Sequence, residues 1–363
     1  MISRLVFVLV VLGIYLGMNW YVLARLLRLF ELNKTVWFYL ALIPLTLSFV
    51  GSLILETRVG NKFTGAFFEL AMVWLGLCGT LFWVLLVQQF VSLVIPAPPR
   101  VWAISVCGLA CGLALYAVVN ARTLTVRRER VPHLPLRIAH LSDIHTGSIH
   151  SGALGEIIAR TNALQPDVVL ITGDVFDNAN PETRAVAPQL KNFNAPVIFT
   201  SGNHEAYTGY ENVRQLLAGT GVRWLRNEAT EFRGARIIGV DNSYDTDLMQ
   251  QVLARTPASP AFTVLMNHQP RGFEIAARHH INLTLSGHVH KGQIWPFNYL
   301  VRLFYPYLSG LHERDGAYLN VSTGTGIWGP PMRLGSHTEI VVLEGERRAT
   351  SREPRAATND GRD

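Results

Sequence analysis

The stretch LRIAHLSDIHTG, residues 136–147, ends a short apolar run with polar residues that can bind a metal ion. Residues 136–141 have the composition of a buried β-strand, and Asp143 and His145 follow where that strand should end. Open α/β sheets form their sites at the carboxyl ends of strands. A single Asp-x-His pair is more often a turn with a capping aspartate. The pair therefore points to a site only if other strands supply partners for it.

The same pattern recurs at the ends of four more predicted strands. The polar residues found there are Asp174 in TGD, Asn203 and His204 in SGNHE, His268 in MNHQP, and His288 and His290 in SGHVH. Each has a structural explanation when taken singly, as a turn, a helix start or a hydrogen-bonded core histidine. Together, in this order and each at a strand end, they predict one shared site.

The residue types at these strand ends favour two divalent metal ions. Oxygen and imidazole ligands without a thiolate suit Mn, Fe or Zn. Two ions about 3.5–4 Å apart can hold a phosphoryl group, activate a bridging water and stabilise the leaving oxygen. Asp174 could bridge both ions, and the neutral amide of Asn203 would limit the negative charge at the site. The sequence therefore predicts a two-metal centre that acts on phosphate.

These residues resemble the signature of the calcineurin-like metallophosphoesterases over about residues 136–343. The blocks that carry the resemblance are Asp143-x-His145, Gly173-Asp174, Gly202-Asn203-His204-Glu205, His268 and Gly287-His288-x-His290. The resemblance implies an α/β four-layer domain of two packed β-sheets flanked by helices. The implied ligand sets are Asp143, His145 and His290 for one ion and Asn203, His268 and His288 for the other, with Asp174 bridging.

The resemblance also implies roles for two residues that are not ligands. His204 would be the catalytic acid that protonates the leaving group, and Asp177 would orient it. Asp177 is followed by Asn178 rather than by the Arg-Gly of the family's protein phosphatases, so a phosphoprotein substrate is not expected. The motif GHVHKGQ, residues 287–293, is similar to the GHTHGGQ of a bacterial membrane-associated branch, with Lys291 replacing a glycine. That branch includes proteins with N-terminal spans and relatives that act on lipid-linked phosphates.

The first third of the chain has the composition of a membrane domain. Residues 1–120 carry ten charged side chains and no histidine, whereas all 12 histidines lie at or beyond His133. Stretches of about 20 apolar residues can cross a bilayer. The chain has four such stretches, at Leu5–Ala24, Val36–Leu55, Phe67–Ile95 and Val101–Val119. We therefore expect about four transmembrane α-helices within residues 1–120. A cleaved signal peptide is the alternative for the first stretch, but it lacks a suitable cleavage site.

The remaining chain divides into a basic linker at 121–135, the α/β domain at 136–345 and a disordered tail at 346–363. With four spans, the N-terminus and the α/β domain share one side of the membrane. That side collects seven of the basic residues near the spans and the opposite side collects four, which favours a cytoplasmic α/β domain in an inner or plasma membrane protein.

The predicted function is that of a membrane-anchored two-metal phosphohydrolase that cleaves a phosphoester or pyrophosphate bond with a metal-bridging hydroxide. The expected partners are a phosphorylated small molecule or lipid and the membrane. Nucleic acid is not expected, because the domain has no basic stripe interleaved with aromatic residues. The alternatives are a nuclease or nucleotide phosphodiesterase, and a membrane sensor or transport protein with a phosphoesterase-like domain. The sequence leaves the oligomeric state open.

One apolar segment beside the predicted site has two explanations. IWPFNYLVRLFYPYLSGL, residues 294–311, follows His290 closely and contains Arg302 as its only charged residue. It could be an ordinary loop that covers the core. It could instead form an interfacial surface whose aromatic side chains lie at the depth of the lipid headgroups.

Overall fold

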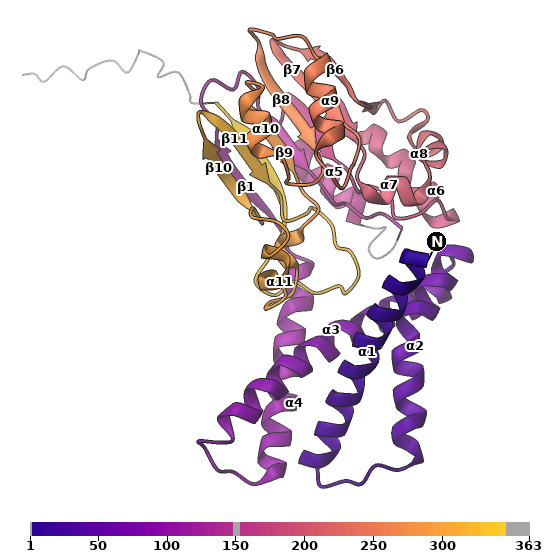
Figure 1. Cartoon of the computed structure of the whole chain (residues 1–363). Helices are drawn as coiled ribbons and strands as arrows, with labels where there is room; N and C mark the ends of the chain where they lie inside the picture. The colour runs from indigo at the N-terminus through magenta and orange to yellow at the C-terminus, as the bar shows by residue number, and fades with distance from the viewer. Residues whose placement is uncertain (1, 148–152, 346–363) are drawn as a thin grey trace, which may run out of the picture.

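The computed structural model describes residues 2–147 and 153–345. In this part of the chain, a bundle of long helices lies next to an α/β domain (Figure 1). The segment 346–363, expected to be a disordered tail, lies outside the described residues.

The four apolar helices expected from the sequence are confirmed. They are α1 (Ile2–Leu29), α2 (Val36–Arg58), α3 (Lys62–Val91) and α4 (Pro99–Ala121). Each is long and apolar enough to cross a membrane. The N-terminus of α1 lies at the end of the bundle that faces the α/β domain (Figure 1). All four helices include residues outside the expected apolar stretches, because flanking residues continue the helical backbone, whereas α3 ends at Val91, before the expected Ile95.

The segment expected to be a basic linker contains a strand, which corrects the domain boundary. Strand β1 (Leu124–Arg130) pairs in parallel with β12 (Thr338–Glu344) at the edge of a sheet. The guanidinium of Arg127 donates two hydrogen bonds to Glu339, at 2.9 and 3.0 Å, and lies 2.6 Å from Glu129. The charged side chains hid the strand from sequence reading, although their burial alternates along it.

The first sheet has the strand order β1-β12-β2-β3-β4-β5. Its other strands are β2 (Ile138–Leu141), β3 (Val168–Thr172), β4 (Val197–Thr200) and the short β5 (Arg223–Trp224), which forms the opposite edge. These four run parallel, and β12 is antiparallel to β2. The short apolar runs read from the sequence therefore become neighbouring strands whose carboxyl ends share one edge.

The second sheet has the order β10-β11-β9-β8-β7-β6. Its strands are β10 (Gly310–Arg314), β11 (Ala317–Val321), β9 (Leu283–Ser286), β8 (Phe262–Asn267), β7 (Ala235–Val240) and β6 (Glu228–Phe232). The four central strands run parallel, and the two outer strands are antiparallel to their neighbours. The outer strands are rich in polar residues, and the sequence did not reveal them.

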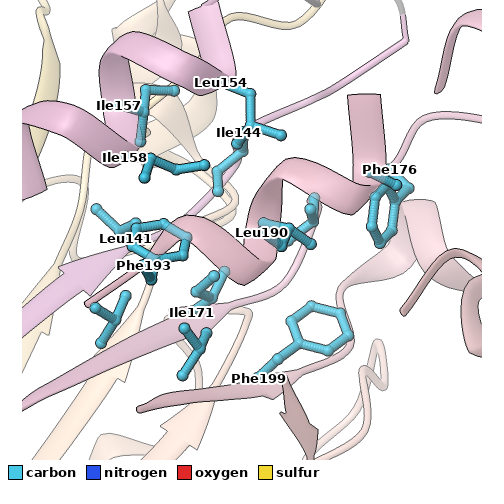
Figure 2. Close-up of a cluster of buried hydrophobic side chains, with 14 of the residues drawn as sticks. Leu141, Ile144, Leu154, Ile157, Ile158, Ile171, Phe176, Leu190, Phe193 and Phe199 are labelled. Atoms are coloured by element: carbon cyan, nitrogen blue, oxygen red, sulfur yellow. The ribbon is translucent and has the colours of Figure 1, made fainter. Parts of the chain in front are cut away.

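The two sheets pack face to face, and helices cover their outer faces. Leu170 of the first sheet and Met266 and Leu285 of the second belong to one buried cluster. The first sheet is covered by α5 (Ala153–Ala163), α8 (Tyr210–Leu217) and the 3₁₀ helix η1 (Ala187–Asn192). Figure 2 shows apolar side chains of α5 and η1 above the strands. The second sheet is covered by α9 (Asp247–Arg255) and α10 (Phe273–Arg278). The predicted four-layer α/β domain is confirmed.

The remaining short helices lie in the loops around the sheets. They are α6 (Pro181–Val186), α7 (Asn203–Thr208), the 3₁₀ helix η2 (His290–Gly292) and α11 (Asn298–Arg302). Three of them follow strands that end in predicted site residues.

A loop of the α/β domain, which we call the strap (residues 327–336), packs between α3 and α4. Met332 is only 1% exposed and belongs to one buried cluster with Ala114 and Ala117 of α4. A side chain at Gly76 of α3 would overlap Met332. The amide of Asn120 in α4 donates hydrogen bonds of 2.7 and 2.9 Å to the carbonyls of Arg333 and Ser336 in the strap. Packing and buried hydrogen bonds therefore fix the α/β domain on the helix bundle.

Candidate metal centre

The seven predicted metal ligands lie together at the carboxyl ends of strands from both sheets. They are Asp143 and His145 after β2, Asp174 after β3, Asn203 after β4, His268 after β8, and His288 and His290 after β9. Six of them are buried and His288 is partly buried. The structure therefore brings together side chains that are up to about 150 positions apart, because the two sheets meet at this edge.

Asp143, His145 and His290 form the first group. Their potential ligand atoms lie within 4.8 Å of one another. Nε2 of His290 is 3.5 Å from Oδ1 of Asp143, and Nε2 of His145 is 3.3 Å from Nε2 of His290. This group matches the ligand set implied for one of the two ions.

Asp174, His268 and His288 form the second group, and Asn203 lies beside it. The potential ligand atoms of the three also lie within 4.8 Å of one another. Nε2 of His268 is 3.1 Å from Oδ2 of Asp174 and 3.2 Å from Oδ1 of Asn203. Nδ1 of His288 lies 3.2 Å from the same Nε2 atom. These residues match the set implied for the other ion, together with the predicted bridge.

Hydrogen bonds turn the lone pairs of three histidines toward the two groups. Nδ1 of His268 donates to the carbonyl of Thr172 at 2.7 Å, which turns Nε2 toward Asp174. Burial lowers the pKa of His268, but Asp174 outweighs it and raises this pKa to about 10, so a metal that binds at Nε2 displaces a proton. Nδ1 of His145 donates to Asp177 at 2.7 Å, which leaves Nε2 free to bind a metal. Nε2 of His288 donates to the hydroxyl of Tyr305 at 3.0 Å, which leaves Nδ1 free. Such partners are typical of histidines that hold metals.

The charges of the two groups fit divalent cations. Asp143 and Asp174 are buried, and no Lys or Arg among the described residues lies within ion-pair distance of either carboxylate. Buried carboxylates need a cationic partner. Burial and the neighbouring His268 lower the pKa of His288 to about 4, and burial beside Arg333 holds the pKa of His290 well below its usual value. Both imidazoles are therefore neutral at pH 7, which is the form that binds metals.

The backbone at the candidate ligands is strained. Asp143, His145, Asp174, His288 and His290 all have positive φ, between 46° and 70°. Such left-handed conformations cost roughly 1–3 kcal/mol each and cluster at functional sites. Aspartate and histidine tolerate this region better than most residues, so the side chains that bind metals also suit the turns that present them.

Glycines leave room for these turns. Gly173 has a φ of +87°, as expected for a strand that turns sharply. Gly202 and Gly287 do not have positive φ, and they are needed for space instead. A Cβ at Gly202 would overlap Asp174, and a Cβ at Gly287 would overlap the side chains of Ser142 and Asp143.

Glu205 is a buried residue that positions Asp174, and sequence analysis assigned it no role. Its carboxylate accepts backbone hydrogen bonds from Asp174, Val175 and Phe176 at 2.8 to 3.1 Å, and from Gly202 at 2.7 Å. It therefore holds the turn after β3 against the start of α7. The available signal was its place at the third position of α7, from which its carboxylate accepts the backbone N–H of the N-cap residue Gly202.

Asp177 connects a candidate ligand to the predicted catalytic acid. Its Oδ1 lies 2.7 Å from Nδ1 of His204 and 2.7 Å from Nδ1 of His145. Burial alone would lower the pKa of His204, but the carboxylates of Asp177 and Asp174 outweigh it and raise this pKa to about 9. His204 therefore holds a proton at neutral pH, with Nε2 directed away from Asp177.

Two residues of the site gave no signal in the sequence. The hydroxyl of Tyr305, which accepts from His288, donates to Oε1 of Gln269 at 3.1 Å. Arg333 is completely buried, and its Nη2 lies 3.0 Å from Nδ1 of His290. Both contacts join segments that are far from the motifs, so no local pattern could reveal them.

Comparisons with known proteins agree with this geometry. A model of the calcineurin-like phosphoesterase family matches residues 136–292. An uncharacterized metallophosphoesterase of Campylobacter jejuni is 29% identical over 93% of this chain and 98% of its own length. One from Aquifex aeolicus is 31% identical over 60% of this chain and 88% of its own length. A transmembrane protein with metallophosphoesterase domain of Bos taurus is 37% identical over 57% of this chain, and the match spans 52% of that protein.

The matched region contains both groups of candidate ligands and His204. The carboxylate and imidazole donors described above fit the dinuclear metal centre that the family uses. The chain thus belongs to the calcineurin-like metallophosphoesterases and is a metal-dependent phosphoesterase with apolar helices at its N-terminus.

Proposed function

We propose that the protein is a membrane-anchored phosphohydrolase that cleaves a phosphoester or pyrophosphate bond in a lipid-linked substrate. The observation that carries this proposal is that the strap reaches from the candidate metal centre into the helix bundle. The ring of Trp328 in the strap lies 5.6 Å from the ring of His204, and Met332, four residues later, is buried against α4. The site therefore adjoins helices that can cross a membrane.

The segment around α11 supports a lipid substrate. Phe297, Leu300, Leu303 and Phe304 are 54%, 49%, 76% and 69% exposed. They do not cover a core, and α11 lies at the end of the α/β domain that faces the bundle (Figure 1). Exposed apolar side chains in such a place are typical of an interfacial surface. Val301, Tyr305, Tyr307 and Leu308 of the same segment pack against a buried cluster of the domain, so the support for the interfacial explanation comes from the exposed residues alone.

The chemistry rests on the candidate ligands and on His204. Two bound divalent ions, for which we propose Mn, Fe or Zn, would supply Lewis acidity to the phosphoryl group and lower the pKa of a water molecule. His204 would donate its proton from Nε2 to the departing oxygen of the substrate. Asp177 would hold the ring of His204 in place and stabilise its protonated form.

We place the α/β domain in the cytoplasm. This proposal is supported by the sequence count of basic residues near the spans, seven on the side that carries the domain against four on the other side. Three of the seven, Arg127, Arg128 and Arg130, lie in β1 of the domain itself. Arg58 and Lys62, which are among the seven, flank the short connection between α2 and α3.

Replacing Asp174 with asparagine should weaken the binding of both metal ions. The substitution keeps the size of the side chain and removes its charge. The loss of hydrolysis should exceed the roughly 10–100-fold that is typical of changes to outer partners of a metal site. Calorimetric titration of the metal-free variant with Mn²⁺ measures the binding directly. The exposed Asp315→Asn substitution is the matched control. Near-normal turnover in Asp174→Asn would show that Asp174 does not bridge.

The His204→Ala variant should lose hydrolysis but keep both ions. General acid catalysis contributes typically 10²–10⁴-fold, so the rate should fall by about that factor. The loss should be smaller for a substrate with a good leaving group, which needs less protonation. Metal analysis of the purified variant is the deciding measurement, with the exposed His280→Ala variant as control. If the purified variant lacks one of the ions, His204 is a metal ligand and not only an acid.

The triple variant Phe297→Ser, Leu300→Ser, Phe304→Ser should lower turnover of a lipid-linked phosphate relative to that of a small soluble diester. These side chains are exposed, so the protein should keep its melting temperature. Turnover of both substrates is measured with the full chain in nanodiscs. Equal losses on both, or an unfolded protein, would mean that the segment is structural.

Reporters fused after Glu346 should show a cytoplasmic α/β domain. One fusion carries an enzyme that is active only outside the membrane, and a second carries a protein that fluoresces only inside. Fluorescence without external enzyme activity is expected. The opposite result would place the domain outside and redirect the search for substrates to the cell envelope.

A further inference from the structure

An apolar groove of about 430 Å³ lies between α3 and α4. Its walls include Val87 of α3 and Val106 and Leu109 of α4, together with Trp295 and Leu334 of the α/β domain. The volume falls within the roughly 300–1,000 Å³ that is typical of ligand sites. A groove formed jointly by membrane helices and a catalytic domain differs from the shallow depressions on any helix pair.

The surroundings of the groove determine what can fill it. Both α3 and α4 have the length and hydropathy of membrane spans, so most of the groove lies at the depth of the hydrocarbon. Val87 is 56% exposed and Leu109 55% exposed, so the groove is accessible from the bilayer. Thr80, one of its few polar lining residues, already donates to the carbonyl of Gly76 at 2.9 Å. An acyl chain is the occupant that this environment offers.

The wall formed by the α/β domain connects the groove to the metal centre. The backbone N–H of Trp295 donates to the carbonyl of Leu334 at 2.8 Å, so these two residues are held together. Trp295 follows the candidate ligand His290 by five residues. Leu334 belongs to the strap, whose Trp328 contacts His204. The groove and the candidate metal centre therefore share the same two segments of chain.

We infer that this groove binds one acyl chain of a lipid whose phosphate group is presented to the metal centre. The inference rests on the proposed function and deepens it, because it assigns the apolar part of the substrate to a site. Lys291, exposed and next to His290, would lie on the side of the headgroup and offers a positive charge to it. A helix of a second copy could also cover the groove, but it would not account for the wall that Trp295 and Leu334 provide.

The test fills the groove and measures lipid contact without relying on hydrolysis. Leu109→Trp adds bulk inside the groove. Leu115→Trp makes the same change on the same helix, at a residue that is 68% exposed and does not line the groove. Each full-length protein is reconstituted in nanodiscs with a phosphatidic acid that carries a diazirine in one acyl chain. Photolysis and peptide mass spectrometry then locate the attached lipid.

In the wild-type protein and in Leu115→Trp, the label should map to peptides of α3, α4 and the segment around Trp295. Leu109→Trp should lose most of this label. In Leu109→Trp, kcat/KM for the lipid phosphate should fall about tenfold relative to kcat/KM for bis(p-nitrophenyl) phosphate. This loss is expected when roughly two methylene groups of the acyl chain are no longer buried.

The labelling and the turnover separate the two proposals. If the wild-type protein is labelled in the groove but hydrolyses no lipid, the proposed substrate class is wrong, while the groove still binds an acyl chain. Labelling spread evenly over the bundle would overturn the proposed acyl-chain site. Equal losses of label in Leu109→Trp and Leu115→Trp would overturn it as well. Cross-links between two copies of the chain through α3 and α4 would also overturn it, because the groove would then be a dimer interface.

Discussion

Two buried carboxylates, Asp143 and Asp174, set the requirement on which the structure around the candidate metal centre depends. Their charges lie at the junction of two sheets, where the described residues offer imidazoles but no Lys or Arg as ion-pair partners. Such an arrangement is stable only when cations compensate it. The hydrogen bonds from His145 to Asp177 and from His268 to Thr172 keep the imidazoles turned toward the place where those cations would bind.

The surrounding backbone serves the same requirement. Five candidate ligands adopt left-handed conformations, and Gly202 and Gly287 make room for the turns that carry them. Glu205 holds the turn after β3 with four backbone hydrogen bonds, so a further buried carboxylate fixes the position of Asp174 without taking part in the group itself. The strain at the ligands is offset by the packed sheets beneath them.

The strap gives the protein its second defining feature, the close connection between metal centre and bundle. It contacts His204 through Trp328, places Arg333 beside His290, and inserts Met332 between α3 and α4. Asn120 fixes it from the side of α4. A membrane anchor joined by a flexible tether would not need such contacts. Here these contacts fix the orientation of the site relative to the helices, as the proposed lipid-linked substrate would require.

The sequence by itself determined the parts that depend on local pattern. Spans follow from runs of about 20 apolar residues, and the inner strands follow from short apolar runs that end in glycine and a polar residue. Asp143, His145, Asp174, Asn203, His268, His288 and His290 could be chosen because each lies at such an end. Strand β1 was missed because its charged residues, such as Arg127, mask an alternating pattern that only pairing with Glu339 explains.

Only the tertiary structure decided the rest. Tyr305 and Arg333 reach the candidate ligands across loops that have no regular period, and Asp177 has two histidine partners where the sequence suggested one. The groove requires Trp295 and Leu334 to meet helices more than 180 positions earlier in the chain. The physical reason is the same in each case. A local pattern records which face of a strand or helix is buried, but it does not record which distant side chain fills the space opposite that face.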